Sequence, residues 1–339
     1  MASGLTEAEV IVVGAGPAGL AAALACHKRG LDCRVIETSK AASAEAAKGR
    51  SAALFNRTVA FLQWLGIWAE CAKAAEPLKK LQFIDDTGRR LRAPDCFFDA
   101  AEIGEEAFGY NITNADLTAV LNAEAEKHGL QPLPAGPLAG FRLGNSCACV
   151  SFNDGTSLCA PLVIAADGRG SAVRTAVNIR TLTWSYDQIA IAASFSHDRP
   201  HRGICIELHR RAGPFTLVPL PGNNSSLVWV ETKSEAERLL ALDDAEFARR
   251  IEEISRLALG RVNNLSPMAK FPLSALAARQ YGKSRVALVG EAAHAVPPIG
   301  AQGLNLGFRD VEVLVRLIGS AKDRGEDIGS DGLLRAYSA

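Results

Sequence analysis

Residues 10–26, VIVVGAGPAGLAAALAC, limit the possible folds of this chain more than any other stretch. The β-branched run at 9–13 is typical of a buried strand, and the Ala- and Leu-rich segment up to about residue 29 is typical of a helix, which Gly30 ends. A second strand is predicted at 33–37. This β-α-β unit has short connections and therefore implies a parallel sheet.

The glycines between the first strand and the helix, Gly14, Gly16 and Gly19, have the spacing of a dinucleotide-binding loop. Gly14 permits the tight turn, Gly16 lets the backbone approach a pyrophosphate, and Gly19 lets the helix pack on the strand. The helix N-terminus offers free N–H groups to the phosphates, and Glu37 can accept hydrogen bonds from a ribose diol. A glycine-rich turn of another α/β protein is the alternative, and the motif does not separate NAD from FAD.

Charge and composition argue against several classes of protein. Lys plus Arg equals Asp plus Glu, at 37 each, so no global field points to nucleic acid or an anionic membrane. Glu7 and Glu9 precede the uncharged run, where a signal peptide would be basic. The eight cysteines contain no metal-ligand pattern; Cys147 and Cys149 are expected to be small apolar strand residues, which fits a reducing compartment.

Two further segments place polar residues directly after apolar runs. Residues 163–174, VIAADGRGSAVR, put Asp167 and Gly168 after a predicted strand. Residues 285–305, RVALVGEAAHAVPPIGAQGLN, end a strand in a lone carboxylate, Glu291, and continue as a Pro- and Gly-rich loop. Such a loop has few large side chains and leaves its backbone exposed, which suits a site where the main chain itself contacts a ligand.

In this order the three motifs resemble those of the FAD-dependent aromatic monooxygenases with the p-hydroxybenzoate hydroxylase fold, over nearly the whole chain. Residues 50–68, 108–121 and 213–220 are similar to the ubiquinone-biosynthesis hydroxylases within that family. The resemblance implies FAD as cofactor, NADPH or NADH as transient reductant, and ring hydroxylation by O₂ through a flavin hydroperoxide. The implied substrate is a polyprenylated phenol, a ubiquinone precursor.

The resemblance also implies roles for individual residues. Glu291 matches the acid that binds the ribityl hydroxyls of FAD, Arg50 matches a position near the pyrophosphate, and Asp167 contacts that region or shapes its loop. The helix that follows the Pro-Gly loop would stabilise negative charge on the reduced flavin. The expected cofactor contacts are Gly14, Gly16, Ala18, Gly19, Glu37, Arg50, Asp167, Gly168, Glu291, Gly303, Leu304 and Asn305, and the expected catalytic loop holds Pro298, Gly300, Gln302 and Gly303. No general base and no metal is expected.

The chain departs from the family pattern at several points. The usual Asp is Glu291, and Asn114 stands where many members place an Arg that meets the cofactor, so weaker FAD binding is expected. The sequence also stops inside a predicted helix where relatives continue, which implies a shortened C-terminus. His294 is either a structural loop residue or a contact to the flavin. The basic residues of 197–211 are interpreted as a solvated sheet edge, with contact to a membrane surface or to NADPH phosphate as the alternative.

The predicted fold is a two-domain α/β protein. A Rossmann-like FAD-binding domain, with a parallel sheet and helices, comprises residues 1–77, 104–182 and 273–339. An inserted substrate domain, 78–103 and 183–272, is a mostly antiparallel β-sheet. Helices are predicted at 56–75, at 114–129 with Asn114 as cap, and at 242–258, with a hairpin at 81–93. Phe215, Leu217 and Val218 are expected to line the substrate wall.

Two other functions remain open at this stage. A soluble aromatic-acid hydroxylase of the same fold would leave a closed pocket with an arginine clamp, whereas a prenylated substrate would leave a long apolar tunnel. A non-catalytic, flavin-poor scaffold for other ubiquinone-biosynthesis proteins would fit the departures at Glu291 and Asn114. The favoured prediction is a cytoplasmic enzyme that is at most peripheral at the inner membrane face.

Overall fold

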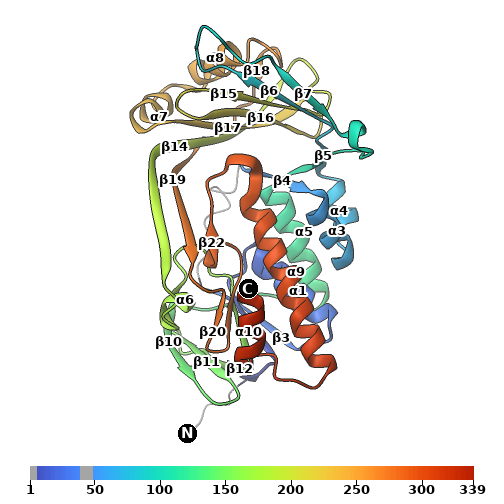
Figure 1. Ribbon diagram of the computed structural model, residues 1–339, viewed down its shortest axis with the longest axis vertical. Coiled ribbons are helices and arrows are strands. Elements are labelled where there is room, and N and C mark those ends of the chain that lie inside the picture. Colours follow the sequence, from blue (N-terminus) through green and yellow to red (C-terminus); the bar gives the residue numbers. More distant parts are fainter. Residues whose placement is uncertain (1–5, 39–48) are drawn as a thin grey trace.

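The computed structural model describes residues 6–38 and 49–339, and a six-stranded, mainly parallel sheet lies toward one end of it (Figure 1). All four residues of the first strand of the Gly-rich motif are buried, because both faces of this sheet are covered. The strands lie in the order β20 (Gly282–Lys283), β21 (Val286–Leu288), β13 (Leu162–Ala165), β2 (Val10–Val13), β3 (Cys33–Glu37) and β9 (Leu133–Pro134), and β20 alone runs antiparallel to its neighbour.

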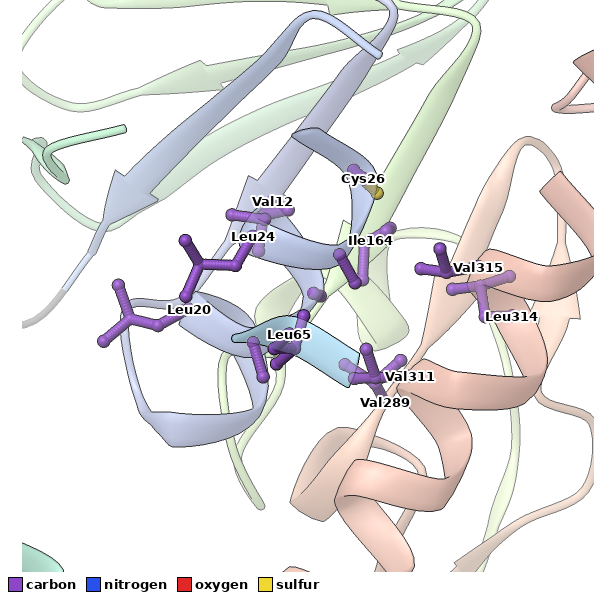
Figure 2. Packing of buried hydrophobic residues seen from close by; sticks show 14 of the residues in the cluster. Val12, Leu20, Leu24, Cys26, Leu65, Ile164, Val289, Val311, Leu314 and Val315 are labelled. Carbon is purple, nitrogen blue, oxygen red and sulfur yellow. The ribbon is translucent and has the colours of Figure 1, made fainter. Parts of the chain in front are cut away.

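Helices cover one face of this sheet. Alternate strand residues such as Val12 and Ile164 point into a core that they share with Leu20 and Val311 of two helices (Figure 2). The helices that contribute to this core are α1 (Pro17–Lys28), α3 (Asn56–Leu65), α4 (Trp68–Ala72), α5 (Asn114–Lys127), α9 (Gln302–Asp323) and α10 (Asp331–Ser338).

A smaller sheet and a short helix cover the opposite face. Ile11 and Val163 point into this second core, together with Val150 and Val173 from the covering elements. The covering elements are β1 (Thr6–Glu7), β12 (Ser157–Ala160), β11 (Ala148–Phe152), β10 (Leu138–Leu143) and α6 (Ala172–Ala176). The parallel sheet is therefore enclosed on both sides, as its unbroken apolar strands require.

A nine-stranded, mostly antiparallel sheet lies at the other end of the molecule (Figure 1). Two helices, α7 (Lys233–Leu240) and α8 (Asp244–Ile254), pack on its outer face around Trp229 and Phe247. The strands are β22 (His294–Ala295), β19 (Ala269–Ala278), β14 (Thr181–His197), β17 (Asn224–Thr232), β16 (Pro214–Leu220), β15 (Ile204–His209), β6 (Lys80–Asp85) and β7 (Cys96–Asp99), with β18 (Val262–Asn263) beside β14. A three-stranded sheet is formed by β4 (Ser51–Phe55), β8 (Gly109–Thr113) and β5 (Ala75–Pro77).

The predicted fold class, a Rossmann-like sheet with an added antiparallel sheet, is confirmed. The long strands β14 and β19 connect the two regions, as Figure 1 shows. The predicted domain boundaries themselves remain a prediction. Among the helices of the described residues, none is both long enough and apolar enough to cross a bilayer.

Several predicted elements were wrong in detail. The helix predicted at 56–75 is broken at Gly66, which takes a positive φ of 92° and ends α3. Thr113, not Asn114, caps α5 and accepts a hydrogen bond from the Asp116 backbone N–H. The helix predicted at 242–258 ends at Ile254, and the hairpin partner of β6 is Cys96–Asp99, after a longer loop than predicted.

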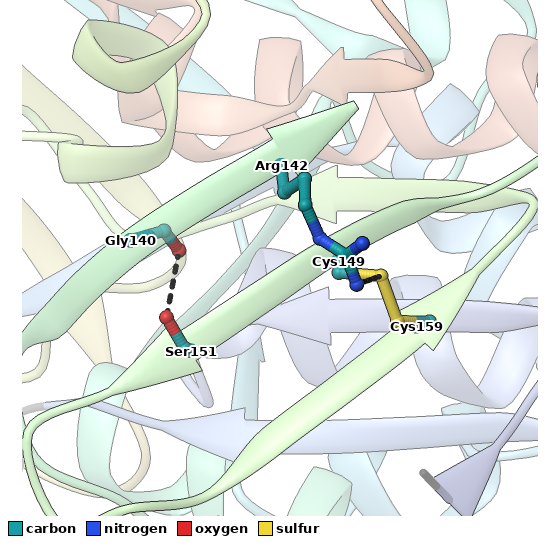
Figure 3. Close-up of a disulfide and its surroundings, with 5 residues drawn as sticks. All are labelled: Gly140, Arg142, Cys149, Ser151 and Cys159. Atoms are coloured by element: carbon teal, nitrogen blue, oxygen red, sulfur yellow. Dashed lines mark hydrogen bonds between the residues drawn. A yellow bond between two sulfur atoms is a disulfide. The ribbon is translucent and has the colours of Figure 1, made fainter. Parts of the chain in front are cut away.

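Cys149 is not a lone strand residue: it forms a disulfide with Cys159 (Figure 3). The two cysteines face each other across β11 and β12, which the turn at 153–155 connects. Sequence spacing did not reveal the pair, because the partners lie ten residues apart and only the hairpin register places them opposite each other.

Candidate functional site

Loops from neighbouring parallel strands meet at the carboxyl edge of the parallel sheet. Glu37 ends β3, Asp167 follows β13 by two residues, and Glu291 follows β21 by three. The strands are in register there, since the Gly14 backbone N–H donates to the Ile36 carbonyl at 2.8 Å and the Ala166 N–H to the Val13 carbonyl at 2.8 Å. The three predicted acids thus lie along the same edge as the Gly-rich turn, which is where open α/β sheets bind ligands.

The three glycines of the turn differ in their surroundings. Gly14 has φ of 112°, and a Cβ there would overlap the Ala166 carbonyl. A Cβ at Gly19 would overlap the Gly14 carbonyl, so both glycines are required by the packing of the protein itself. A Cβ at Gly16 would meet no described atom within 4 Å. Gly16 is also the N-cap of α1, whose first turn carries no acidic side chain, and this leaves room and N–H donors for an anion.

Asp167 is held at one oxygen and unpartnered at the other. Its Oδ2 accepts a hydrogen bond from the Val173 backbone N–H at 3.1 Å, whereas Oδ1 is buried without a partner among the described residues. Burial raises the pKa of this carboxyl, because the charged form is desolvated. Gly168 follows with a φ of 79° and forms the turn that directs the chain away from the strand.

Arg174 connects the loop of Asp167 to the loop of Glu291. It is 7 % exposed, and its guanidinium donates to the Ala292 carbonyl and to the Arg169 carbonyl, both at 2.8 Å. Desolvation lowers the pKa of Arg174, and the charge of Asp167 opposes that effect. Its position in VIAADGRGSAVR was visible in the sequence, but its role as a link between two loops was not predicted.

Glu291 lies in a short 3₁₀ turn, and its exposed carboxylate lines a cavity. The turn is held from α9: Asp310 Oδ2 accepts the Gly290 backbone N–H at 2.9 Å and lies 2.6 Å from His294 Nε2. His294 Nδ1 is buried without a partner among the described residues, so the choice between a structural role and a flavin contact for His294 stays a prediction. Ala18 also packs here, since a Cβ at Gly290 would lie 3.2 Å from the Ala18 Cβ.

The N-terminus of α9 opens next to this turn. Gly300 and the N-cap Ala301 both take left-handed conformations, which bend the Pro-Gly loop into the helix. No acidic residue occupies the first turn, so the N–H groups of Gly303 and Leu304 face no competing carboxylate from that turn. The Asn305 side chain is fully used by the protein: Nδ2 donates to the Ala53 and Ala301 carbonyls, and Oδ1 accepts from Phe55 N and Thr58 Oγ1. The Asn305 side chain therefore has no donor or acceptor left for a ligand.

A cavity of about 320 Å³ lies between these loops and the inner face of the antiparallel sheet. Its strand wall contains Ala190 and Ala192 of β14, Val228 of β17, and Phe271 and Leu273 of β19. Its other wall contains the predicted residues Arg50, Glu291 and Pro298, together with Arg169 and Pro297. Gly300 and Gly303 do not line this cavity; Gln302 and Asn305 line a second, smaller cavity of about 130 Å³ beside α3.

The predicted substrate wall was wrong, because none of its three residues lines the cavity. Phe215 and Leu217 are buried on the outer face of the sheet, in the core under α7 and α8. Val218 has the opposite orientation along β16 but does not line the cavity. The strand was identified correctly, but side chains alternate between faces, and periodicity does not say which face meets the cavity.

Asn114 contacts Arg50, which lines the cavity, although Asn114 itself does not line it. The Asn114 backbone N–H donates to the Arg50 carbonyl at 2.9 Å, and the Arg50 guanidinium lies 4.7 Å from the ring centroid of Phe271. Asn114 Oδ1 is buried without a partner among the described residues. An unpartnered acceptor of this kind is unfavourable in a closed protein and suits a hydroxyl or N–H donor of a ligand.

Together, the hydrogen-bond donors and acceptors of these residues fit FAD. The open space at Gly16 and the free N-terminus of α1 suit a pyrophosphate. The acceptors Asp167 Oδ1, Asn114 Oδ1 and the exposed carboxylate of Glu291 suit the hydroxyl-bearing parts of the molecule. The sequence did not predict the contributions of Arg169, Phe271 and Ala190, because they reach the cavity only through the packing of one sheet against the other.

Comparison with known proteins agrees with this fit. A family model described as "FAD binding domain" matches residues 7–339. Ubiquinone hydroxylase UbiL of Rhodospirillum rubrum is 33 % identical over 335 residues, covering 98 % of this chain and 77 % of that protein. The 3-demethoxyubiquinol 3-hydroxylase of Escherichia coli is 30 % identical over 336 residues, covering 97 % and 84 %.

A solved structure has the same fold. PqsL of Pseudomonas aeruginosa, in a mutant form, superposes with a TM-score of 0.83 at 20 % identity and covers 98 % of this chain and 91 % of that one. The resemblance inferred from the three motifs is thereby confirmed, as is FAD as the cofactor. The chain belongs to the FAD-binding-domain family, in the branch of FAD-dependent monooxygenases that includes the ubiquinone hydroxylases.

Proposed function

We propose that this chain binds FAD along the carboxyl edge of its parallel sheet and hydroxylates the aromatic ring of a polyprenylated ubiquinone precursor. The observation that carries the proposal is the convergence of the Gly-rich turn, the Asp167 loop and the Glu291 loop on one edge, beside a cavity roofed by a second sheet. Relatives named as ubiquinone hydroxylases support the substrate class.

The proposed roles follow from the local geometry. The α1 N-terminus at Gly16 binds the pyrophosphate, with Arg50 as a nearby positive charge, and Glu37 accepts the ribose hydroxyls. Glu291 accepts the ribityl hydroxyls. The N-terminus of α9, at Gly303 and Leu304, faces the negative edge of the reduced ring system and stabilises it by about 1 kcal/mol or more where water is excluded.

Bound FAD supplies the redox chemistry, with NADPH or NADH as electron source and O₂ as oxidant. The protein orients the substrate ring and excludes water. In this proposal the small residues Ala190 and Ala192 leave space for a planar ring, and Phe271 and Pro298 close the cavity around it. A cavity of about 320 Å³ does not hold a whole polyprenyl chain, so the tail extends outward and the protein meets its substrate at a membrane surface, with other biosynthetic proteins as candidate partners.

One observation favours a second function, the hydroxylation of a soluble aromatic acid. Arg50 and Arg169 both line the cavity, and a pair of guanidinium groups suits a carboxylate. A substitution at Arg169 distinguishes the two candidate functions. Arg50 does not serve for this, because it is assigned to the cofactor. For an aromatic acid, Arg169→Met raises KM by about 10- to 100-fold, the equivalent of a lost charge-assisted hydrogen bond. For a neutral prenylated phenol, KM changes little.

The decisive experiment deletes the gene in a quinone-producing host and identifies the compound that accumulates. Accumulation of a prenylated ring that lacks one hydroxyl supports the proposal, and restoration by the intact gene but not by a Gly16→Ala copy ties it to the cofactor site. An unchanged quinone pool refutes it. In parallel, purified holoenzyme is tested for NAD(P)H oxidation stimulated by a prenylated phenol and by benzoate-type acids.

A further inference from the structure

A cluster of three cysteines lies on the small sheet, and none of them lines either cavity described above. Cys149 and Cys159 face each other across β11 and β12. Cys147 precedes Cys149 by two residues, and side chains two residues apart on an extended chain point to the same side. The three Sγ atoms all lie within 4.8 Å of one another.

The cluster lies on the side of the sheet that faces away from the core. Ala148 and Val150 point into the second core, so the cysteines that alternate with them point outward. Arg142, opposite Cys149 on β10, extends over the sulfurs, and its Nη2 lies 3.6 Å from Cys149 Sγ (Figure 3). Cys149 and Cys159 are each 8 % exposed, whereas Cys147 is partly accessible to solvent.

We propose that the reduced chain binds one thiophilic d¹⁰ cation, Zn²⁺ in the first instance, through Cys147, Cys149 and Cys159, and that the Cys149–Cys159 disulfide excludes this ion. Zinc–sulfur bonds of about 2.3 Å in tetrahedral geometry place sulfurs about 3.8 Å apart, so the observed cluster needs only small side-chain movements. Three thiolates and Zn²⁺ carry a net charge of about −1, which the Arg142 guanidinium offsets. Water completes the fourth position on the accessible side of Cys147.

The sequence predicted no metal site, because the two cysteines of the Cys-x-Cys motif had no second motif nearby. The third ligand comes from the neighbouring strand, and the register of β11 and β12 brings it to the other two. The conversion of the disulfide form into the zinc-bound form balances chemically. A phosphine reductant takes oxygen from water and becomes a phosphine oxide, while the two sulfurs gain two electrons and two protons. Zn²⁺ then displaces the thiol protons.

The test uses the holoenzyme, reduced with a phosphine, desalted without air and titrated with Zn²⁺ against a chromophoric indicator. Cd²⁺ serves as a spectroscopic probe, because each thiolate ligand adds charge-transfer absorbance in the ultraviolet. We expect one ion per chain, and no binding at this site after the disulfide has been formed. Cys147→Ser is expected to remove about one third of the Cd²⁺ absorbance and to weaken Zn²⁺ binding by at least about tenfold, the loss typical of removing even an outer partner of a ligand.

Cys96→Ser is the matched control, since Cys96 is exposed and lies outside the cluster, and it is expected to bind as the wild type does. Flavin content and melting temperature of each variant report whether it is folded. A reduced wild type that binds no ion at one equivalent refutes the proposal. So does a Cys147→Ser or Cys159→Ser variant with unchanged Cd²⁺ absorbance, or an oxidised protein that binds as tightly as the reduced one.

Discussion

Substitution of the Gly-rich turn separates the packing of the protein from its cofactor binding. An added methyl at Gly19 overlaps the Gly14 carbonyl, and a backbone oxygen cannot rotate away, so the helix has to move from the sheet. Overpacking of this kind costs about 1–3 kcal/mol, and the upper end is expected here. A chain of 339 residues has an unfolding entropy of about 0.7 kcal/mol/K, so Gly19→Ala is expected to lower the melting temperature of the apoprotein by about 4 °C.

Gly16→Ala is expected to behave in the opposite way. Its methyl meets no described atom within 4 Å, and its φ of −73° and ψ of 176° suit alanine. Weaker capping costs at most about 1 kcal/mol, which lowers the melting temperature by about 1–2 °C. In the proposed binding mode the methyl stands where the pyrophosphate approaches the helix N-terminus. The loss of one or two charge-assisted hydrogen bonds, about 2–4 kcal/mol, is expected to weaken FAD binding by about 30- to 1000-fold.

Both quantities are measured on the same apoprotein preparations, by thermal unfolding followed by circular dichroism and by quenching of flavin fluorescence during titration. The wild type and a surface variant, Gly332→Ala, control for the effect of an added methyl, because Gly332 is exposed, has no positive φ, and an added Cβ there would meet only Ser330 Oγ at 4.0 Å. The reasoning is refuted if apo Gly16→Ala is as unstable as apo Gly19→Ala. It is equally refuted if Gly16→Ala binds FAD with wild-type affinity.

Three further predictions concern individual side chains, two of them in the site and one in an ion pair at the amino edge of the parallel sheet. Glu291→Gln keeps the size of the side chain and a hydrogen-bond acceptor but removes the charge. It is expected to weaken FAD binding by about tenfold in the same fluorescence titration, while Glu291→Asp retains most of the affinity. Equal affinity of the wild type and both variants would contradict the role of the carboxylate. Arg174→Met leaves one buried and one partly buried carbonyl without a donor and is expected to cost about 2–4 kcal/mol, or about 3–6 °C in melting temperature, and an unchanged melting temperature would contradict it. The Arg285 guanidinium holds the pKa of Asp327 below its usual value, so the pair stabilises the fold above the unfolded pKa of about 3.9 and loses that effect as the pH falls through the folded value. Asp327→Asn is therefore expected to lower the melting temperature at pH 7 by about 1–2 °C and to match the wild type at the lowest pH that both tolerate, and a constant difference across pH would contradict the linkage.

The sequence alone determined the parallel sheet, its Gly-rich turn and the order of three motifs, because these depend on local rules. A buried strand is continuously apolar, a tight turn needs glycine at Gly14, and a carboxylate at a strand end, such as Glu291, signals a ligand. The family assignment followed from the order of these local features along the chain, and the comparisons confirmed it.

The tertiary structure decided which side chains meet. Strand periodicity identified β16 but not the face that Phe215 presents, and the spacing of the cysteines did not place Cys149 opposite Cys159. In the sequence, Arg174 looks like an ordinary surface residue and Asn305 like an ordinary helix residue. In the structure, Arg174 connects two loops, and Asn305 anchors the start of α9. Contacts between segments more than a hundred residues apart depend on sheet register and on how the layers pack, and neither leaves a local pattern in the sequence.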